Sequence, residues 1–170
     1  MSRLLVIGCG GVAQVAISKC CQNSKTFTEL CIASRTKSKC DALKEKLQPK
    51  TDTVITTAKV NADSKDELVA LIKEYKPDAV LNVALPYQDL TIMDACLECK
   101  VDYIDTANYE PDDTDDPEWR AIYEKRCKEK GFTAYFDYSY QWEYMDKFKE
   151  AGITGLLGTG FDPGVTSVFK

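Results

Sequence analysis

The sequence predicts an α/β protein with a Rossmann-type, doubly wound parallel sheet of strand order 3-2-1-4-5-6. Short apolar runs alternate with helical stretches along most of the 170 residues. The runs are nearly apolar throughout, which is typical of parallel strands covered on both faces. The first run leads directly into a glycine-rich turn and a helix, as in dinucleotide-binding folds.

The expected elements alternate in order along the chain. Ser64 and Glu67 have the spacing of a capping box at the start of the third helix. Pro117 is a suitable first residue for the fifth helix, and Asp162 followed by Pro163 predicts the start of a further one. The expected strands are 4–7, 30–33, 54–60, 79–84, 103–106 and 153–158, and the expected helices are 12–23, 37–47, 65–75, 88–99, 118–130 and 141–151.

Length and composition predict one domain with a charge that disfavours polyanionic partners. The 170 residues are 44% hydrophobic, which is enough for a core. A net charge of −5 argues against nucleic acid and anionic membrane surfaces, which require clustered Lys and Arg. The sequence offers neither a bilayer-spanning stretch nor a signal peptide. We therefore expect a cytoplasmic protein that binds neither nucleic acid nor membrane.

The eight cysteines predict packing rather than metal binding or disulfides. They fall mostly within expected strands and helices, where reduced cysteine behaves as a small apolar residue. Cys96 and Cys99 have the spacing of a redox or metal pair, but no second pair and no histidine completes a zinc site. We expect no metal. Without histidine, proton transfer here would use Asp, Glu, Tyr, Lys or Cys.

The first turn has the pattern G-x-G-x-x-A and predicts a site for a dinucleotide phosphate. Gly8 allows the tight turn, Gly10 lets backbone N–H groups approach a pyrophosphate, and Ala13 lets the helix pack closely on the strand. Gly11 and Val12 open the helix, whose N-terminus supplies free N–H donors and partial positive charge. The alternative is a tight turn without a ligand.

The end of the second strand predicts NADP rather than NAD. NAD-binding chains usually carry an acid roughly 20 residues past the glycine motif, for the ribose 2′-hydroxyl. Ser34 lies 21 residues after Ala13, and Ser34, Arg35 and Thr36 include no acid. Two hydroxyls and a guanidinium suit a 2′-phosphate. The alternative is that Arg35 is a solvated loop cation.

Other loops at the carboxyl ends of the strands could contact cofactor or substrate, since ligands of open α/β sheets bind there. We expect Asp63 to reach the adenine, and Ala84 and Leu85 to line the nicotinamide side. The Asp162 turn would face the reacting centre. Asp63 and Asp162 could equally be helix caps.

Taken together, several segments resemble the N-terminal half of the carboxynorspermidine dehydrogenase (carboxynorspermidine synthase) family, within the wider saccharopine dehydrogenase/reductase group. The likeness covers essentially the whole chain. The stretches 84–90 and 105–110 are more specific than the glycine motif. The segments that carry it are residues 8–15, 33–36, 82–90, 93–97, 101–110 and 160–166.

The resemblance implies a two-part enzyme that uses NADPH. Residues 1–170 would form the NADP-binding Rossmann domain, and a C-terminal domain absent from this sequence would bind substrate and pair two subunits. The implied reaction is reductive condensation of L-aspartate 4-semialdehyde with 1,3-diaminopropane or putrescine, through an imine that accepts hydride. Asp105 and Asp162 are the local carboxylates expected to stabilise iminium charge, though each has a structural alternative.

Three other functions remain open at this point. A saccharopine reductase would differ in its amino-acid substrate more than in this cofactor-binding half. A regulatory module would bind NADP without catalysis. A methyltransferase that uses S-adenosylmethionine also has a glycine-rich first turn, but it normally carries an acid at the end of the second strand, where this chain has Arg35.

Overall fold

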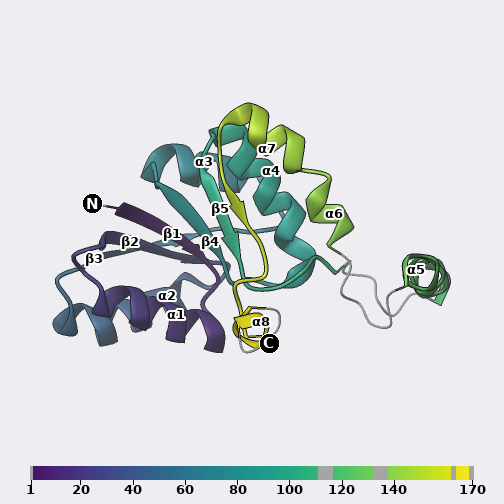
Figure 1. Ribbon diagram of the computed structural model, residues 1–170. Helices are drawn as coiled ribbons and strands as arrows, with labels where there is room; N and C mark the ends of the chain where they lie inside the picture. Colours follow the sequence, from purple (N-terminus) through teal and green to yellow (C-terminus); the bar gives the residue numbers. More distant parts are fainter. Residues whose placement is uncertain (1, 111–116, 132–137, 162–163, 169–170) are drawn as a thin grey trace.

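The computed structural model of the chain describes residues 2–110, 117–131, 138–161 and 164–168. Its centre is a six-stranded parallel sheet of order β3-β2-β1-β4-β5-β6, which confirms the predicted strand order (Figure 1). The strands are β1 (Ser2–Ile7), β2 (Phe27–Ser34), β3 (Val54–Lys59), β4 (Ala79–Asn82), β5 (Asp102–Asp105) and β6 (Gly155–Leu156). The α-helices are α1 (Gly11–Gln22), α2 (Lys37–Leu47), α3 (Lys65–Tyr75), α4 (Asp89–Cys99), α5 (Pro117–Lys130), α6 (Ser139–Trp142), α7 (Met145–Ala151) and α8 (Val165–Val168).

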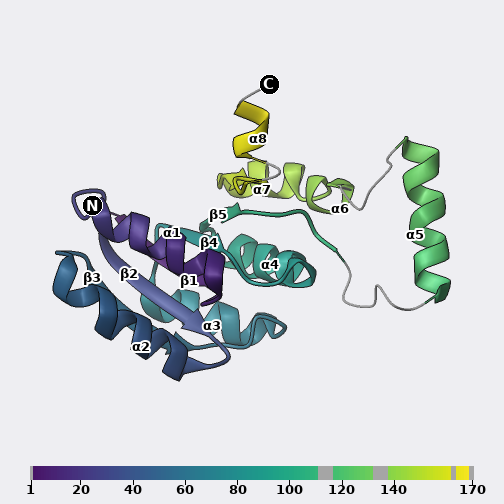
Figure 2. The ribbon, with the colours of Figure 1, turned by 90° about the horizontal axis from the view of Figure 1, so that it is seen from below.

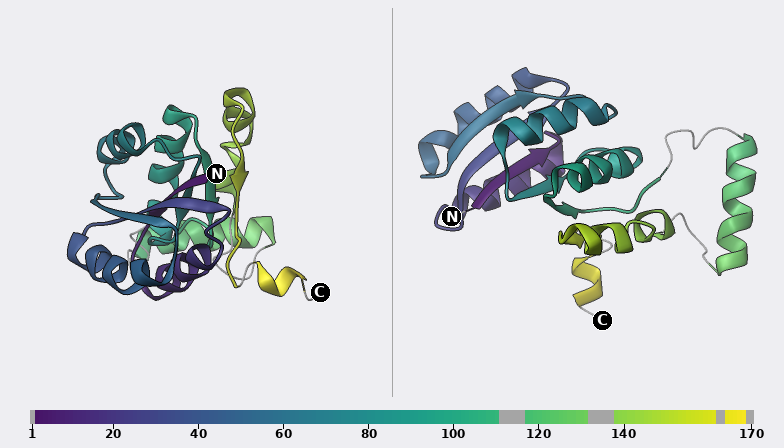
Figure 3. Two further views of the ribbon diagram at one scale, coloured as in Figure 1. Left: turned by 90° about the vertical axis from the view of Figure 1, so that its left-hand side faces the viewer. Right: turned by 90° about the horizontal axis from the view of Figure 1, so that it is seen from above.

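Helices cover both faces of the sheet, and side-chain alternation along β1 shows why. Leu4 and Val6 point into one core with α1 and α2, whereas Leu5 and Ile7 point into the other with α3 and α4. All four side chains are almost completely buried. Because a strand that is buried on both faces has no solvent side, its sequence is apolar at every position. The two layers of helices are seen on opposite sides of the sheet in Figures 1 and 3.

The carboxyl-terminal part of the chain extends the second layer. Phe148 of α7 is buried in the same core as Leu5 and Ile7, beside Met93 of α4. α5 lies beyond α4, on the opposite side of the molecule from β3 (Figures 2 and 3). The sheet, α1 to α4 and α7 thus form the layered body that positions the site.

Several predicted boundaries were wrong for identifiable reasons. The fourth strand ends at Asn82 rather than residue 84: the Val83 N–H still donates to the Ile7 carbonyl, but the Ala84 N–H donates to the Asn82 side chain instead of to a neighbouring strand. The expected helix 141–151 is divided into α6 and α7, and the last strand is only Gly155–Leu156. The expected helix start at Asp162 and Pro163 lies outside the described residues.

Of the two hydrogen bonds in the capping box predicted for α3, only one is confirmed. Ser64 Oγ accepts the Glu67 N–H at 3.4 Å. Glu67 Oε2, however, accepts the N–H of Asn61 at 2.9 Å rather than that of Ser64. The glutamate therefore joins the helix to Asn61, two residues after the end of β3, and so helps to shape the loop after that strand.

The cysteines pack as small apolar side chains. All eight are free thiols, and Cys31, Cys40 and Cys96 are buried in the two cores. Burial raises the pKa of Cys96 far above its ordinary value. Among the described residues, no group of His, Cys, Asp or Glu side chains could hold a metal ion. No helix in the described segments combines the length and apolarity needed to cross a bilayer.

Candidate cofactor site

A cleft of about 390 Å³ opens at the carboxyl ends of β1, β2 and β4. Its position is where strand order reverses in the sheet, because successive strands run from β1 toward β3 on one side and from β4 toward β6 on the other. The residues that line it come from the ends of the strands, from the segments that follow β1, β2, β3 and β4, and from α2: Ile7, Gly8, Cys9, Gly10, Ser34, Arg35, Thr36, Lys39, Val60, Ala62, Val83, Ala84, Leu85 and Gln88.

Gly8 forms the tight turn that the sequence predicts. Its φ is +120°, a backbone conformation that side chains with a Cβ rarely adopt. A Cβ at this position would lie 2.4 Å from the carbonyl oxygen of Val83. The end of β1 therefore packs backbone against backbone on the residue that follows β4, and only glycine fits.

Open space beside the first turn of α1 fits a phosphate. A Cβ at Gly10 or Gly11 would meet no atom within 4 Å. Gly10 is the N-cap, the first turn contains no acidic residue, and the first helical N–H groups have no acceptor within the helix. Ala13 is fully buried against the sheet, whereas Val12 is 64% exposed. Free donors and a partial positive charge at a glycine-lined opening suit a pyrophosphate.

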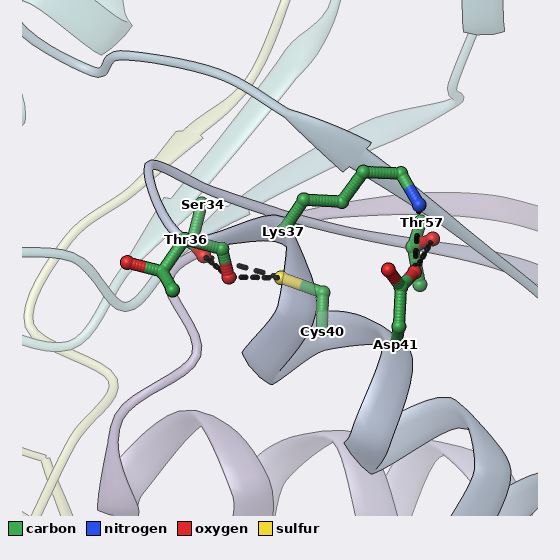
Figure 4. Close-up of polar contacts among 6 residues, drawn as sticks. All are labelled: Ser34, Thr36, Lys37, Cys40, Asp41 and Thr57. Carbon is green, nitrogen blue, oxygen red and sulfur yellow. Dashed lines mark hydrogen bonds and ion pairs between the residues drawn. The ribbon is translucent and has the colours of Figure 1, made fainter.

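Two cations, Arg35 and Lys39, line one end of the cleft, the basic end. Both residues are exposed, and neither forms an ion pair among the described residues. Lys37, between them, pairs with Asp41 at 2.7 Å, and Asp41 also accepts a hydrogen bond from Thr57 (Figure 4). The Lys37 charge is therefore satisfied on the β3 side, while Arg35 and Lys39 remain available to an anion.

Ser34 and two thiols fix the shape of the basic end. Ser34 Oγ lies 3.2 Å from Cys40 Sγ and donates to the Thr36 carbonyl at 3.2 Å (Figure 4). Thr36 is the N-cap residue of α2, although its side chain makes no capping bond. Burial and, to a smaller extent, the neighbouring Cys40 thiol raise the pKa of Cys9 to about 11. Cys9 thus stays neutral at physiological pH and adds no negative charge where a phosphate would lie.

The β4 side of the cleft is formed by a short 3-10 turn, η2 (Pro86–Gln88). Ala84 and Leu85 line the cleft just before it. Gln88 is 4% exposed; its Nε2 donates to Asp63 Oδ1 at 2.6 Å, and its Oε1 accepts the Leu85 N–H at 3.4 Å. Asp63 is therefore a support for the turn beside the cleft, and it is not itself among the lining residues.

Asp105 lies inside the protein rather than on the cleft wall. It is 1% exposed, and its carboxylate accepts the Gly158 N–H and the Gln141 amide, each at 2.6 Å. Its backbone carbonyl accepts both the N–H and the hydroxyl of Thr159. Burial raises the pKa of Asp105 to about 6. In the described structure this carboxylate joins β5 to the segment after β6, and its role at a substrate stays a prediction.

The structure brings most of the expected cofactor residues together. Gly8, Gly10, Ser34, Arg35, Thr36, Ala84 and Leu85 line one cleft, with Gly11, Val12 and Ala13 at the adjoining helix start. Asp162 lies outside the described residues. Lys39 was not among the predicted cofactor residues, although its spacing offered a signal: it follows the N-cap residue Thr36 by three positions, about one helical turn.

The cleft fits an NADP molecule by the chemistry of its donors. A dinucleotide needs phosphate donors at its centre, and its 2′-phosphate needs a basic site at one end. The open helix N-terminus supplies the first, and the basic end supplies the second. No described carboxylate lines the cleft.

Comparison with protein families identifies this domain. Residues 4–156 match the family model described as the saccharopine dehydrogenase NADP binding domain. This match confirms the predicted family group and NADP as its cofactor class.

Curated relatives include longer proteins with closely related names. The chain is 45% identical over 170 residues to a carboxyaminopropylagmatine dehydrogenase from Synechocystis sp., covering 99% of this chain and 37% of that protein. It is 43% identical over 171 residues to a carboxynorspermidine synthase from Vibrio alginolyticus, covering 98% of this chain and 38% of the relative. The chain thus spans less than two fifths of the length of these relatives.

Solved structures share the fold at low sequence identity. Saccharopine dehydrogenase (L-Glu forming) from Saccharomyces cerevisiae superposes with a TM-score of 0.65 at 17% identity, over 99% of this chain and 29% of that chain. A UDP-glucose-4-epimerase from Stenotrophomonas maltophila matches 63% of this chain and 37% of that chain, with a TM-score of 0.53 at 16% identity. The family match and the identities of 43–45% show that the chain belongs to the saccharopine dehydrogenase NADP-binding domain family.

Proposed function

We propose that this chain is the cofactor-binding part of an NADPH-dependent oxidoreductase that joins L-aspartate 4-semialdehyde to an amine by reductive condensation, on a route to polyamines. The observation that carries the proposal is the cleft with its basic end, together with relatives named for carboxylated polyamines. When bound, the cofactor would supply the hydride.

The residues of this chain would bind and orient the cofactor. The first turn of α1, with Gly10, Gly11 and Val12, would donate N–H groups to the pyrophosphate. Arg35, Ser34 and Thr36, with Lys39, would bind the 2′-phosphate. The lining residues that follow β4, Ala84 and Leu85 among them, would cover the nicotinamide side and exclude water.

Two amine classes are candidates for the second substrate. Relatives named carboxynorspermidine synthase support a diamine such as 1,3-diaminopropane or putrescine. The relative that is 45% identical carries agmatine in its name, which supports agmatine as the alternative. The amine-binding residues would lie largely in a substrate and dimerisation domain outside this sequence, and we propose a cytoplasmic homodimer for the full-length protein.

The test uses the full-length protein with NADPH, L-aspartate 4-semialdehyde and each of the three amines separately. We expect NADPH oxidation only when aldehyde and amine are both present, with a carboxylated secondary amine as the product detected by mass spectrometry. Oxidation with the aldehyde alone would contradict the condensation. Turnover of saccharopine instead would assign the alternative amino-acid dehydrogenase function.

A further inference from the structure

Asn82, the last residue of β4, lies at the centre of a buried hydrogen-bond network. It is 3% exposed. Its Nδ2 donates to Asp89 Oδ1 at 2.6 Å and to the Tyr103 hydroxyl oxygen at 3.0 Å. Its Oδ1 accepts the N–H of Ala84 at 3.0 Å. Both ends of the amide are therefore used, one toward the interior and one toward the turn that follows the strand.

The partners of Asn82 determine which way its amide faces. Asp89 Oδ1 and the Tyr103 oxygen are acceptors here, so the amide NH₂ must point toward them. If the amide were reversed, its NH₂ would face the Ala84 N–H, and two donors would meet in a buried place. Because an unpaired buried polar group costs about 1–3 kcal/mol, the reversed arrangement is disfavoured.

The Tyr103 hydroxyl, which accepts from Asn82, also faces the buried Asp105, because each of these two groups influences the pKa of the other. Asp105 is itself held by Gln141 and Gly158, and Gln141 Oε1 accepts the N–H of Tyr109 at 3.0 Å. The segments after β5 and β6 thus hold Asp105 in place beside Tyr103, which is in turn bonded to Asn82 and through it to the turn after β4.

That turn forms the wall of the cleft opposite the basic end. Ala84 and Leu85 line the cleft, and the Val83 carbonyl lies against Gly8. In the sheet order, β4 lies on the other side of β1 from β2. A dinucleotide that spans this crevice with its 2′-phosphate at β2 therefore has its nicotinamide half near the end of β4.

Asp89 completes the arrangement as a buried acceptor. It is 3% exposed, and its second oxygen, Oδ2, has no hydrogen-bond partner. Burial, together with the charges of Asp105 and Glu110, raises the pKa of Asp89 to about 8, although the hydrogen bond from Asn82 acts in the opposite direction. Asp89 is thus mainly a neutral carboxyl group at pH 7, and its contribution to Asn82 is the acceptor oxygen rather than a charge.

We propose that Asn82, oriented by Asp89 and Tyr103, is the positioning residue for the nicotinamide half of the cofactor. It acts through the Ala84 N–H, which fixes the backbone of Ala84 and Leu85. The inference rests on the proposed function, since it requires NADP in this cleft. It goes beyond that function by predicting which half of the bound cofactor each residue affects.

The test compares two ligands on the full-length protein. NADPH carries the nicotinamide half, whereas adenosine 2′,5′-bisphosphate carries only the half that would contact the basic end. For Asn82→Leu, we expect the Kd of NADPH to rise about tenfold and that of the bisphosphate to stay within about twofold, since the hydrogen bond that holds the Ala84 N–H is lost at one end of the cleft only. The blue shift of bound NADPH fluorescence should also decrease.

Two further substitutions keep the test informative if Asn82→Leu does not fold. Tyr103→Phe removes one partner of Asn82 while keeping the ring, and should raise the Kd of NADPH about threefold with the same selectivity. Asp89→Asn keeps an acceptor oxygen and should retain most of the NADPH affinity, whereas Asp89→Leu should lose it. Urea unfolding of each variant controls for global stability.

The outcomes separate the inference from the proposed function. Equal weakening of both ligands in the folded variants, or no change in either, would overturn the positioning role while leaving NADP binding intact. Wild-type protein that binds neither ligand would overturn the proposed function and this inference with it.

Discussion

Gln88 donates a 2.6 Å hydrogen bond from its Nε2 to Oδ1 of Asp63, which joins the loop after β3 to the turn after β4. The two residues are 25 positions apart in the sequence. Because Gln88 also accepts the Leu85 N–H, an exposed carboxylate in one loop supports a lining residue of the cleft in another. The walls of the cleft are thus connected to each other before any ligand binds.

This bond predicts a modest stability loss for Asp63→Ala. Removal of the carboxylate leaves the buried Gln88 amide without its acceptor, so we expect the free energy of unfolding to decrease by about 1–2 kcal/mol. Urea denaturation followed by circular dichroism would measure this. Asp52→Ala is the matched control, since exposed Asp52 makes no side-chain hydrogen bond in the described structure; an equal loss there would contradict the assignment.

The basic end predicts the cofactor preference. Arg35→Asp should raise the Kd of NADPH by about tenfold or more while leaving NADH little changed, because a carboxylate repels the 2′-phosphate. Lys39→Gln should have a smaller effect of about threefold. Lys37→Gln is the control, since Lys37 already pairs with Asp41. Fluorescence titrations with both cofactors would check this, and equal wild-type affinities for NADPH and NADH would contradict the assignment.

The glycines of the first turn should separate stability from binding. Gly8→Ala introduces a Cβ against the Val83 carbonyl at a positive φ, so we expect a loss of about 2–4 kcal/mol in the free energy of unfolding. Gly11→Ala meets no atom and should fold within about 1 kcal/mol of wild type. Its methyl group would occupy phosphate space, so NADPH affinity should fall about tenfold. Unchanged affinity in Gly11→Ala would argue against a phosphate at this turn.

The two buried carboxyl groups predict that stability decreases as the pH rises. The folded protein holds protons on Asp89 and Asp105 up to pKa values of about 8 and about 6, whereas the ordinary value is 3.8. Between pH 4 and 8 the folded state therefore binds more protons than the unfolded state, and each extra proton reduces stability by up to about 1.4 kcal/mol per pH unit.

Asp89→Asn tests this pH dependence, since the amide cannot ionise. We expect the variant to lose less stability than wild type between pH 6 and 8, where Asp89 titrates in the folded protein. Urea midpoints at half-unit pH intervals would measure the difference. Parallel curves for the two proteins would show that Asp89 does not carry the effect.

The sequence by itself determined the sheet order, the glycine turn and the basic character of the cleft, because these depend on local signals. The apolar strand before Gly8 and Gly10 can be recognised from neighbouring residues alone. The same is true of Arg35 and Thr36, which directly precede a helix. The alternation of strands and helices then leaves few arrangements of a parallel sheet.

Only the tertiary structure decided which polar residues meet. Lys39 lines the cleft together with Arg35 because α2 begins at Lys37. Lys37 does not line the cleft, and its ammonium group pairs with Asp41 instead. Asp105 has the sequence context of a site residue, yet Gln141 and Gly158, far along the chain, enclose its carboxylate. Such contacts join residues with no local relationship, since burial and hydrogen-bond pairing depend on how distant segments pack and not on their spacing.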